Sequence, residues 1–271
     1  MSTMSIVVDP DWWKSMFDEV YLLTDARSVC DTDITRREIN IICELIPLKP
    51  DDRILDLCGG HGRHSLELCR RGFSQCTVLD YSKSLLQVGS RSAVRANYPV
   101  QFTWGDARSL DYPVSHFDHI LILGNSLGYI SDGEADQQIL KECFRVLRPG
   151  GWLLADVTNG ASVRSRFSPN AWHEIGSDTV VCRQRQLKGL TIEAREMVLN
   201  KDTGLVRDCC YSIRMYTPAD LAELLSSVGF AGARIHEDFS PYGKKRGDYG
   251  FMNYRMIATA QKPKEPNRRQ R

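Results

Sequence analysis

The stretch Arg53-Ile-Leu-Asp-Leu-Cys-Gly-Gly-His-Gly-Arg63 decides how this chain folds. It joins a short apolar run to a cluster of glycines, and an amphipathic helical pattern follows. A strand that turns sharply into a helix exposes unpaired backbone N–H groups, and glycines let a ligand approach them closely. A second apolar run ends on Asp80, whose carboxylate is placed to accept hydrogen bonds from ribose hydroxyls. The two runs predict one βαβ unit that binds a nucleotide-type cofactor.

The sequence on both sides continues this alternation of apolar runs and amphipathic segments, which is typical of a parallel sheet with helices on both faces. The expected strands of this core are 53–57, 76–80, 100–104, 117–123 and 151–157, and the expected helices are 62–72, 83–97 and 134–147. A turn at Arg148-Pro-Gly-Gly151 closes the third helix. Two further strands, near 231–239 and 251–261, complete the sheet. We therefore expect an α/β fold with a Rossmann-like, seven-stranded, doubly wound sheet.

Two additions to this core are predicted. Residues 10–46 show helical spacing twice, which indicates two N-terminal helices. After the fifth strand, three strands at 179–187, 190–198 and 205–215 predict an antiparallel β insertion. A helix then follows at 217–229, because threonine precedes a proline at its first position and glycine ends it.

These elements predict a single domain over residues 1–261. Its parts are an N-terminal helical cap (1–49), a cofactor-binding core (50–159), a β insertion that acts as a substrate lid (160–215), and a C-terminal helix with the last strands (216–261). The polar residues 262–271 are expected to form a disordered tail.

Composition restricts the partners and the compartment. Thirty-five Lys and Arg against 34 Asp and Glu leave a net charge of +1 in 271 residues, which disfavours nucleic acid and anionic membranes as partners. The nine cysteines form no Cys-x-x-Cys pair, which favours reduced thiols in the cytoplasm. Neither a secretory signal pattern nor an apolar run of transmembrane length is present. No surface pattern fixes the oligomeric state, and a homodimer stays open.

The glycine cluster itself selects among cofactors. Dinucleotide enzymes place Gly-x-Gly-x-x-Gly here, but Ser65 stands where the third glycine would be. Asp56, just before the glycines, would repel a phosphate and attract an ammonium group, directly or through water. S-adenosylmethionine carries both an amino group and a nucleoside, and it meets both demands.

Five motifs in order resemble the class I S-adenosylmethionine-dependent methyltransferases of the small-molecule type, over residues 50 to 160. They are Leu55-Asp-Leu-Cys-Gly-Gly-His-Gly62, Val78-Leu-Asp-Tyr-Ser82, Gly105-Asp-Ala107, Phe117 to Ser126 and Val146-Leu-Arg-Pro-Gly-Gly151. The sequence departs from the family at Cys58, where a glycine is usual.

The resemblance implies a set of cofactor contacts. Asp56 faces the amino group, the glycine turn approaches the cofactor, Asp80 binds the ribose, Tyr81 and Ala107 flank the adenine, and Asp106 lies near its amino group. The end of the fourth strand contributes contacts beside the transferred methyl group. The expected cofactor-binding residues are Asp56, Gly59, Gly60, Gly62, Asp80, Tyr81, Asp106, Ala107, Gly124, Asn125 and Ser126.

The acceptor half of the site is less defined by sequence. Methyl transfer needs alignment more than acid–base catalysis, so no catalytic residue is assigned, and the candidates are Asn125, Tyr21, His236 and Tyr249. Tyr129 and Arg183 are candidate substrate contacts, and surface solvation is the expected role of at least two of Arg183, Arg185 and Arg195. His61 and His64 lie at a helix start, which disfavours a cation. His116 and His119 straddle the start of a strand, so we expect no metal site.

The sequence therefore predicts an enzyme that transfers a methyl group from S-adenosylmethionine to an oxygen or nitrogen of a small molecule. A methyltransferase acting on RNA or protein, and an S-adenosylmethionine-binding protein that does not methylate, are the alternatives. The Asn/Asp-Pro-Pro-Tyr/Phe motif of nucleic-acid and protein amide methylation is absent.

Overall fold

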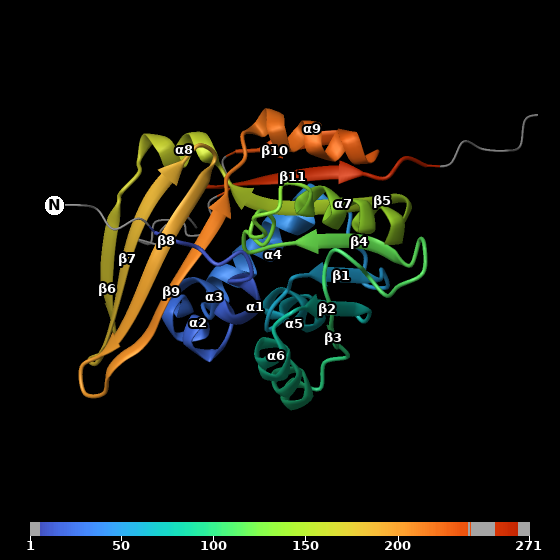
Figure 1. Cartoon of the computed structure of the whole chain (residues 1–271). Helices are drawn as coiled ribbons and strands as arrows, with labels where there is room; N and C mark the ends of the chain where they lie inside the picture. Colours follow the sequence, from blue (N-terminus) through green and yellow to red (C-terminus); the bar gives the residue numbers. More distant parts are fainter. Residues whose placement is uncertain (1–5, 238, 240–252, 265–271) are drawn as a thin grey trace, which may run out of the picture.

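The computed structural model describes residues 6–237, 239 and 253–264, which form two β-sheets with helices packed around them (Figure 1). The larger sheet has seven strands in the order β10-β11-β5-β4-β1-β2-β3. Its first five strands in sequence run parallel, β11 pairs with β5 in antiparallel orientation, and β10 pairs antiparallel with β11 and so runs in the same direction as the first five. The expected α/β class and seven-stranded sheet are confirmed. The strands are β1 (Ile54–Leu57), β2 (Cys76–Asp80), β3 (Gln101–Trp104), β4 (Phe117–Ile122), β5 (Leu147–Thr158), β10 (Ala231–His236) and β11 (Arg255–Gln261).

The strand order positions a site. The chain runs outward from β1 through β2 to β3 and then returns to the other side of β1 as β4. Crossovers leave in opposite directions at this point, so a crevice opens at the carboxyl ends of β1 and β4. The crossover helices are α5 (Arg63–Arg70), α6 (Lys83–Ala96) and α7 (Ala135–Val146), and α9 (Pro218–Val228) packs beside α7.

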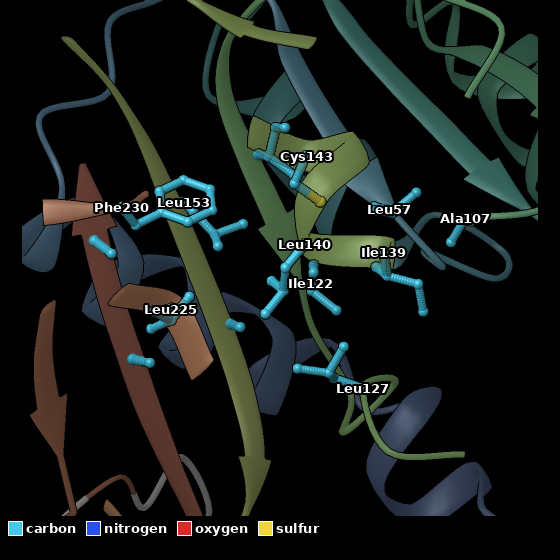
Figure 2. Close-up of a cluster of buried hydrophobic side chains, with 14 of the residues drawn as sticks. Leu57, Ala107, Ile122, Leu127, Ile139, Leu140, Cys143, Leu153, Leu225 and Phe230 are labelled. Atoms are coloured by element: carbon cyan, nitrogen blue, oxygen red, sulfur yellow. The ribbon is translucent and has the colours of Figure 1, made fainter. Parts of the chain in front are cut away.

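Apolar side chains fill both faces of this sheet. On one face, Leu57, Ile122 and Leu153 of the central strands meet Leu140 of α7 and Leu225 of α9 (Figure 2). On the other, residues of β1, β4 and β5 pack against Ile39 and Ile42 of α4 (Thr32–Leu45). The central strands are buried on both sides, which explains why they read as nearly continuous apolar runs.

The predicted turn after α7 is wrong in detail. Helix α7 ends at Val146 and β5 begins at the next residue, so the Pro-Gly-Gly segment lies inside the strand. Leu147 pairs with Phe117, and the register shifts before Trp152 pairs with His119. Gly150 has φ of 79°, so the irregular backbone needs glycine there.

The N-terminal segment also differs from expectation, because three short helices replace the first long one. They are α1 (Trp13–Met16), α2 (Glu19–Thr24) and α3 (Ala26–Val29). Asp18 interrupts the helical pattern, since its extended backbone and its side chain cap α2 by accepting the N–H of Tyr21. Figure 1 shows these helices between the carboxyl edge of the larger sheet and the second sheet.

The second sheet is the predicted insertion, and it is larger than expected. It has four antiparallel strands in sequence order, β6 (Asn170–Ile175), β7 (Thr179–Lys188), β8 (Thr191–Asn200) and β9 (Gly204–Arg214). Helix α8 (Gly160–Ser165) and edge strand β6 were not predicted. Strand β6 alternates exposed and half-buried positions, and Trp172 is 71% exposed, so it lacks the apolar alternation that marks a half-buried strand.

The last predicted helix is confirmed as α9. Thr217 caps it by accepting the N–H of Asp220, whose side chain accepts the N–H of Thr217 in return, and Gly229 ends it with φ of 109°. The longest helices in the described part of the chain have 14 residues, and none there is long and apolar enough to cross a membrane.

Candidate active site

A cavity of about 1000 Å³, including its open mouth, lies at the carboxyl edge of the larger sheet. Its wall combines the turn after β1, the ends of β2, β3 and β4, and the N-terminal helices. Cavities of this size hold typical cofactors. The lining residues used below are Trp13, Phe17, Tyr21, Val29, Cys58, Gly59, Gly60, His61, Asp80, Tyr81, Asp106, Ala107, Gly124, Ser126 and Tyr129.

The turn after β1 is built from unusual backbone conformations. Cys58, Gly60 and Gly62 all have φ between 57° and 70°, in the left-handed region. That region suits glycine and strains Cys58, which stands where the family usually has a glycine. Burial raises the pKa of the Cys58 thiol well above its ordinary value, so it stays neutral. The turn leads directly into α5, and Arg63 and His64 at the start of this helix also line the cavity.

Asp56 supports this turn from below. It is fully buried, accepts a hydrogen bond from Ser65 Oγ at 2.9 Å, and has a pKa raised by burial. A Cβ added at Gly59 would lie 2.7 Å from the Asp56 carboxyl carbon, so only glycine fits above it. The Asp56 side chain does not line the cavity, so its expected contact with the cofactor's amino group, directly or through water, stays a prediction.

The orphaned oxygen of Asp56 tests whether S-adenosylmethionine fits. Its Oδ1 atom has no hydrogen-bond partner among the described residues. This atom lies behind Gly59, and Gly59 itself lines the cavity. A buried carboxylate oxygen without a donor is costly. An ammonium group above Gly59 would supply the missing positive charge across the turn, so the residues present fit this cofactor.

Asp80 ends β2 on the wall of the same cavity. Its Oδ2 accepts the N–H of Gly60 at 2.7 Å and its Oδ1 accepts the N–H of Ser82 at 2.7 Å. Each oxygen keeps a second lone pair for a hydroxyl donor. Burial raises the pKa of Asp80 to about 6, although the two backbone donors oppose the rise.

The neighbouring wall is aromatic on one side and charged on the other. The Tyr81 ring lies 4.9 Å from the ring of Trp13, which the N-terminal segment contributes. Asp106 binds Arg108, with Nη2 2.6 Å from Oδ2. Burial would raise the pKa of Asp106, but Arg108 lowers it overall. Tyr81, Asp106 and Ala107 line this part of the cavity, where we predict that the adenine binds.

The end of β4 forms the floor between this cavity and a second one. Gly124 and Asn125 have φ of 73° and 63°, and both N–H groups bind the carboxylate of Asp156. The Asn125 side-chain oxygen accepts hydrogen bonds from the backbone N–H and the hydroxyl of Thr158, at 2.6 and 2.8 Å. Its amide oxygen is therefore committed to holding β4 and β5 together.

A second cavity, of about 670 Å³, adjoins the first. It lies between the N-terminal helices and the inner face of β7, β8 and β9. The two cavities share the wall residues Phe17, Tyr21, Val29, Gly124 and Tyr129. The remaining wall of the second cavity is Trp12, Met16, Asp25, Ser28, Asn125, Arg183, Arg185, Glu196, Tyr211 and Ile213.

The inner wall of the second cavity carries buried charges. Arg183 Nε lies 2.7 Å from Glu196 Oε2 across two paired strands, and Arg183 Nη2 lies 3.1 Å from Asp25 Oδ2 of the N-terminal segment. Burial raises the pKa of Tyr211 to about 12, and it also raises the pKa values of Tyr21 and Tyr129. These hydroxyls therefore stay protonated at neutral pH.

The predicted residues divide between the two cavities. Eight of the eleven expected cofactor residues line the first cavity, but Asp56, Gly62 and Asn125 do not. Gly62 instead starts α5, and a Cβ there would contact Phe102. Tyr21, Tyr129, Asn125 and Arg183 line the second cavity.

Other predicted residues lie elsewhere. His236 belongs to strand β10 and lines neither cavity, and Tyr249 lies outside the described residues. Arg185 is buried on the wall of the second cavity. Only Arg195 pairs with Asp208 away from both cavities, so solvation of at least two arginines was the wrong expectation.

The histidines near the glycine turn have structural environments. His64 Nε2 lies 2.9 Å from Glu38 Oε2 in the buried interior. Burial and the neighbouring Arg63 lower the pKa of His61 to about 4, so it is neutral at physiological pH. His119 bonds to Asp52 at 3.0 Å and His116 stacks on Tyr112, so neither points toward the other.

Sequence reasoning missed Trp12, Asp25 and Glu196 as cavity residues. The sequence does indicate Glu196, because this charged residue stands at an inward-facing position of β8, between the buried Ala194 and Val198. A charged residue at such a position needs a buried partner or a ligand. Asp25 carries no such signal, since it reaches the cavity only through the packing of short helices.

Comparisons with known proteins agree with this geometry. The sequence profile of a family described as "Methyltransferase domain" matches residues 54–151. The chain is 30% identical over 237 residues to a demethylmenaquinone methyltransferase of Streptomyces avermitilis, covering 85% of this chain and 91% of that protein.

Two solved structures share the fold. The CcbJ methyltransferase of Streptomyces caelestis matches with a TM-score of 0.73 and 18% identity, over 94% of this chain and 99% of that one. The sugar N-methyltransferase KedS8 of a Streptoalloteichus species matches with a TM-score of 0.67 and 18% identity, over 97% and 98%. The glycine turn, the acid at the end of β2 and the relative that matches over most of its length lead to one assignment. The chain belongs to the class I methyltransferases that use S-adenosylmethionine as cofactor.

Proposed function

We propose that this methyltransferase acts on an oxygen or nitrogen of a small polar molecule that binds in the second cavity. The observation that carries the proposal is the shared wall of the two cavities. Gly124 and Tyr129 belong to both, so an acceptor in the second cavity meets the cofactor in the first at the end of β4. The second cavity is lidded by the N-terminal helices, which suits a small acceptor better than a polymer.

When bound, the cofactor would supply an activated methyl group on its sulfonium, which the acceptor atom would take in exchange for a proton while sulfur keeps the electron pair of its former bond to carbon. Such a displacement needs an aligned nucleophile about 3–3.5 Å from the carbon and the exclusion of water. Phe17, Tyr21 and Tyr129 form the walls at this junction and would exclude water.

Proton removal has few candidates on these walls. The three tyrosines have raised pKa values and are poor bases at neutral pH. His61 is neutral and lines only the first cavity. We propose that the protein acts chiefly by alignment, and that the acceptor proton is released to solvent water.

Methylation of demethylmenaquinone is the candidate suggested by the name of the Streptomyces avermitilis relative. The second cavity argues against it, because Asp25, Arg183 and Glu196 would face a largely apolar quinone. Burying charges against apolar groups is unfavourable. RNA or protein substrates stay the less supported alternative, since they would need an open basic cleft.

A blocking substitution tests the proposal. Ser28 lines only the second cavity, so Ser28→Leu should abolish methyl transfer and leave the dissociation constant for S-adenosylmethionine unchanged. Ser92→Leu is the matched control, because Ser92 makes the same hydroxyl-to-carbonyl bond within a helix away from both cavities. The measurements are calorimetry and transfer of labelled methyl groups to low-mass metabolites. Label found only in RNA or protein would contradict the proposal.

Two expectations about cellular context continue as proposals. All nine cysteines lie in the described part of the chain as free thiols, which supports a reducing, cytoplasmic compartment. A homodimer is neither required by the two cavities nor opposed by them, and light scattering would decide it.

A further inference from the structure

Two buried polar atoms on the wall of the second cavity lack partners. Glu196 is fully buried, and its Oε1 has no hydrogen-bond partner among the described residues, although Oε2 binds Arg183. Trp12 is 6% exposed, and its indole N–H likewise has no acceptor in the described structure. Buried polar groups are almost always hydrogen-bonded, so each unsatisfied one needs an explanation.

The two atoms have opposite requirements. A carboxylate oxygen accepts hydrogen bonds, and an indole N–H only donates them. Glu196 comes from β8 and Trp12 from the N-terminal segment, so two separate parts of the chain each leave one group unsatisfied toward the same cavity. A ligand that satisfies both must donate and accept. Hydroxyl groups do both, whereas an ammonium group only donates.

Trp12 and Glu196 are placed to recognise the acceptor and not to contact its reacting atom. Trp12 and Glu196 line the second cavity but not the first. The reacting atom of an acceptor would lie at the shared wall, beside Gly124 and Tyr129. The groups held by Trp12 and Glu196 would therefore belong to another part of the same molecule.

Aromatic rings surround this end of the cavity. Trp12 packs 5.3 Å from the Tyr129 ring and 5.7 Å from the Tyr211 ring, measured between ring centroids. The apolar faces of a ring-shaped polyol would pack on such surfaces while its hydroxyls reach polar atoms at the rim. A fully apolar acceptor would leave both Glu196 Oε1 and the indole N–H unsatisfied.

We propose that the acceptor is a polyhydroxylated small molecule, and that Glu196 and Trp12 recognise its hydroxyl groups at a distance from the methylated atom. The inference rests on the proposed function, because it names the substrate class of that same cavity. Glu196 accepts a hydrogen bond from one hydroxyl, and the indole of Trp12 donates one to another.

The first test identifies the acceptor class. Full-length protein is incubated with methyl-labelled S-adenosylmethionine and either the polar or the lipid fraction of a cell extract. A labelled polyhydroxylated product from the polar fraction supports the inference. A labelled product only from the lipid fraction, or a polar product without hydroxyl groups, overturns it and leaves methyl transfer to a small molecule intact. No product from either fraction overturns the proposed function itself.

The second test uses the acceptor found in this way. Glu196→Gln should raise its KM by on the order of 10- to 100-fold, as expected for the loss of a charged hydrogen bond, with kcat changed much less. Trp12→Phe removes only the N–H and should raise KM by about 3- to 10-fold for a neutral bond. The dissociation constant for S-adenosylmethionine should stay unchanged in both.

Two matched controls lie on the second sheet and line neither cavity. Glu193 is on β8 but pairs with Lys188 and Gln186, and Trp172 is an exposed tryptophan on β6. Glu193→Gln and Trp172→Phe should leave KM unchanged. If Glu196→Gln does not fold, Glu196→Asp keeps the charge beside Arg183 and withdraws the free oxygen, and the same rise in KM is expected. An unchanged KM in the folded Glu196 and Trp12 variants would overturn the inference.

Discussion

At the scale of single residues, the cofactor half of the site depends on two carboxylates, Asp56 and Asp80, and on the glycine turn that both of them contact. Asp56 excludes any side chain at Gly59, and Asp80 holds the N–H of Gly60. Asp56 is fully buried and Asp80 is half-buried, and burial raises the pKa of each. The glycine turn thus lies between two carboxylates whose pKa values are raised. A ligand with an ammonium group and hydroxyls would supply positive charge near Asp56 and hydrogen bonds to Asp80.

Cofactor affinity should therefore depend on the ionisation of Asp80. Its pKa is raised to about 6 by burial, and the anion accepts hydroxyl hydrogen bonds more strongly than the neutral acid. The dissociation constant for S-adenosylmethionine should rise as pH falls through about 6, by up to about tenfold per pH unit if only the anion binds. Calorimetry between pH 5 and 8 measures this dependence.

Asp80→Asn is the control for this titration, because it removes the charge at every pH and keeps the size of the side chain. Its affinity should be weaker at pH 7.5 and nearly independent of pH between 5 and 7. If the variant followed the same pH profile as the wild type, the titrating group would be another residue.

At the scale of elements, the N-terminal helices connect the two sheets. Each of α1, α2 and α3 has six residues or fewer, too short to be stable alone. Ser82 Oγ donates to the carbonyl of Phe17 at 2.5 Å on the side of the core. On the side of the insertion, Arg207 pairs with Asp18 and donates to the carbonyl of Met16. Tertiary contacts therefore fix these helices over both cavities.

Asp18→Ala should loosen this segment, because it removes both the cap of α2 and the ion pair with Arg207. Loss of a cap costs about 0.5–2 kcal/mol. We expect faster hydrogen exchange over residues 13–24 and a several-fold faster dissociation of S-adenosylmethionine, measured by exchange mass spectrometry and stopped flow.

Asp33→Ala is the matched change, since Asp33 is an exposed acid that pairs with Arg36 in the first turn of α4. It should alter exchange only locally. Equal effects of the two substitutions on cofactor dissociation would show that the N-terminal segment does not cover the cofactor.

Elements were predictable from sequence where one local signal decided them. The core strands follow apolar runs, and α9 follows its threonine, proline and glycine. Elements whose local signal was masked or weak were missed. Asp18 caps α2 within a segment whose apolar residues keep helical spacing, and β6 forms at a sheet edge with almost no apolar signal. The same limit applies to the site, because the acceptor cavity joins segments about 170 residues apart, such as Asp25 and Glu196.

At the scale of the whole molecule, one buried ionic network joins the helices, the sheet and the site. Arg255 of β11 is fully buried and bonds Glu38 of α4 and Asp156 of β5, each at 2.7 Å. Arg63, at the start of α5, pairs with the same Glu38. Asp156 in turn binds the N–H groups at the end of β4. The floor between the two cavities thus depends on an ionic network in which Arg63 lines the first cavity and Glu38, Asp156 and Arg255 line neither.

Removing Arg255 should be costly, because it leaves two buried carboxylates without their shared partner. Arg255→Met is expected to lower the free energy of unfolding by about 3–5 kcal/mol, measured by urea denaturation at pH 7.5. Arg70→Met is the control, since Arg70 pairs with Glu67 while half exposed, and should cost less than about 1 kcal/mol.

Burial opposes ionisation of Glu38, but Arg63, His64 and Arg255 hold its pKa well below the ordinary value. Its stabilising contribution is therefore present above about pH 4.5 and lost as pH falls through the lowered pKa. In the variant the Glu38 pKa is less depressed, so the difference in unfolding free energy between wild type and Arg255→Met should be largest near pH 7.5 and shrink toward pH 4. A difference that did not change with pH would mean that packing of the Arg255 side chain, and not its charge, holds the network together.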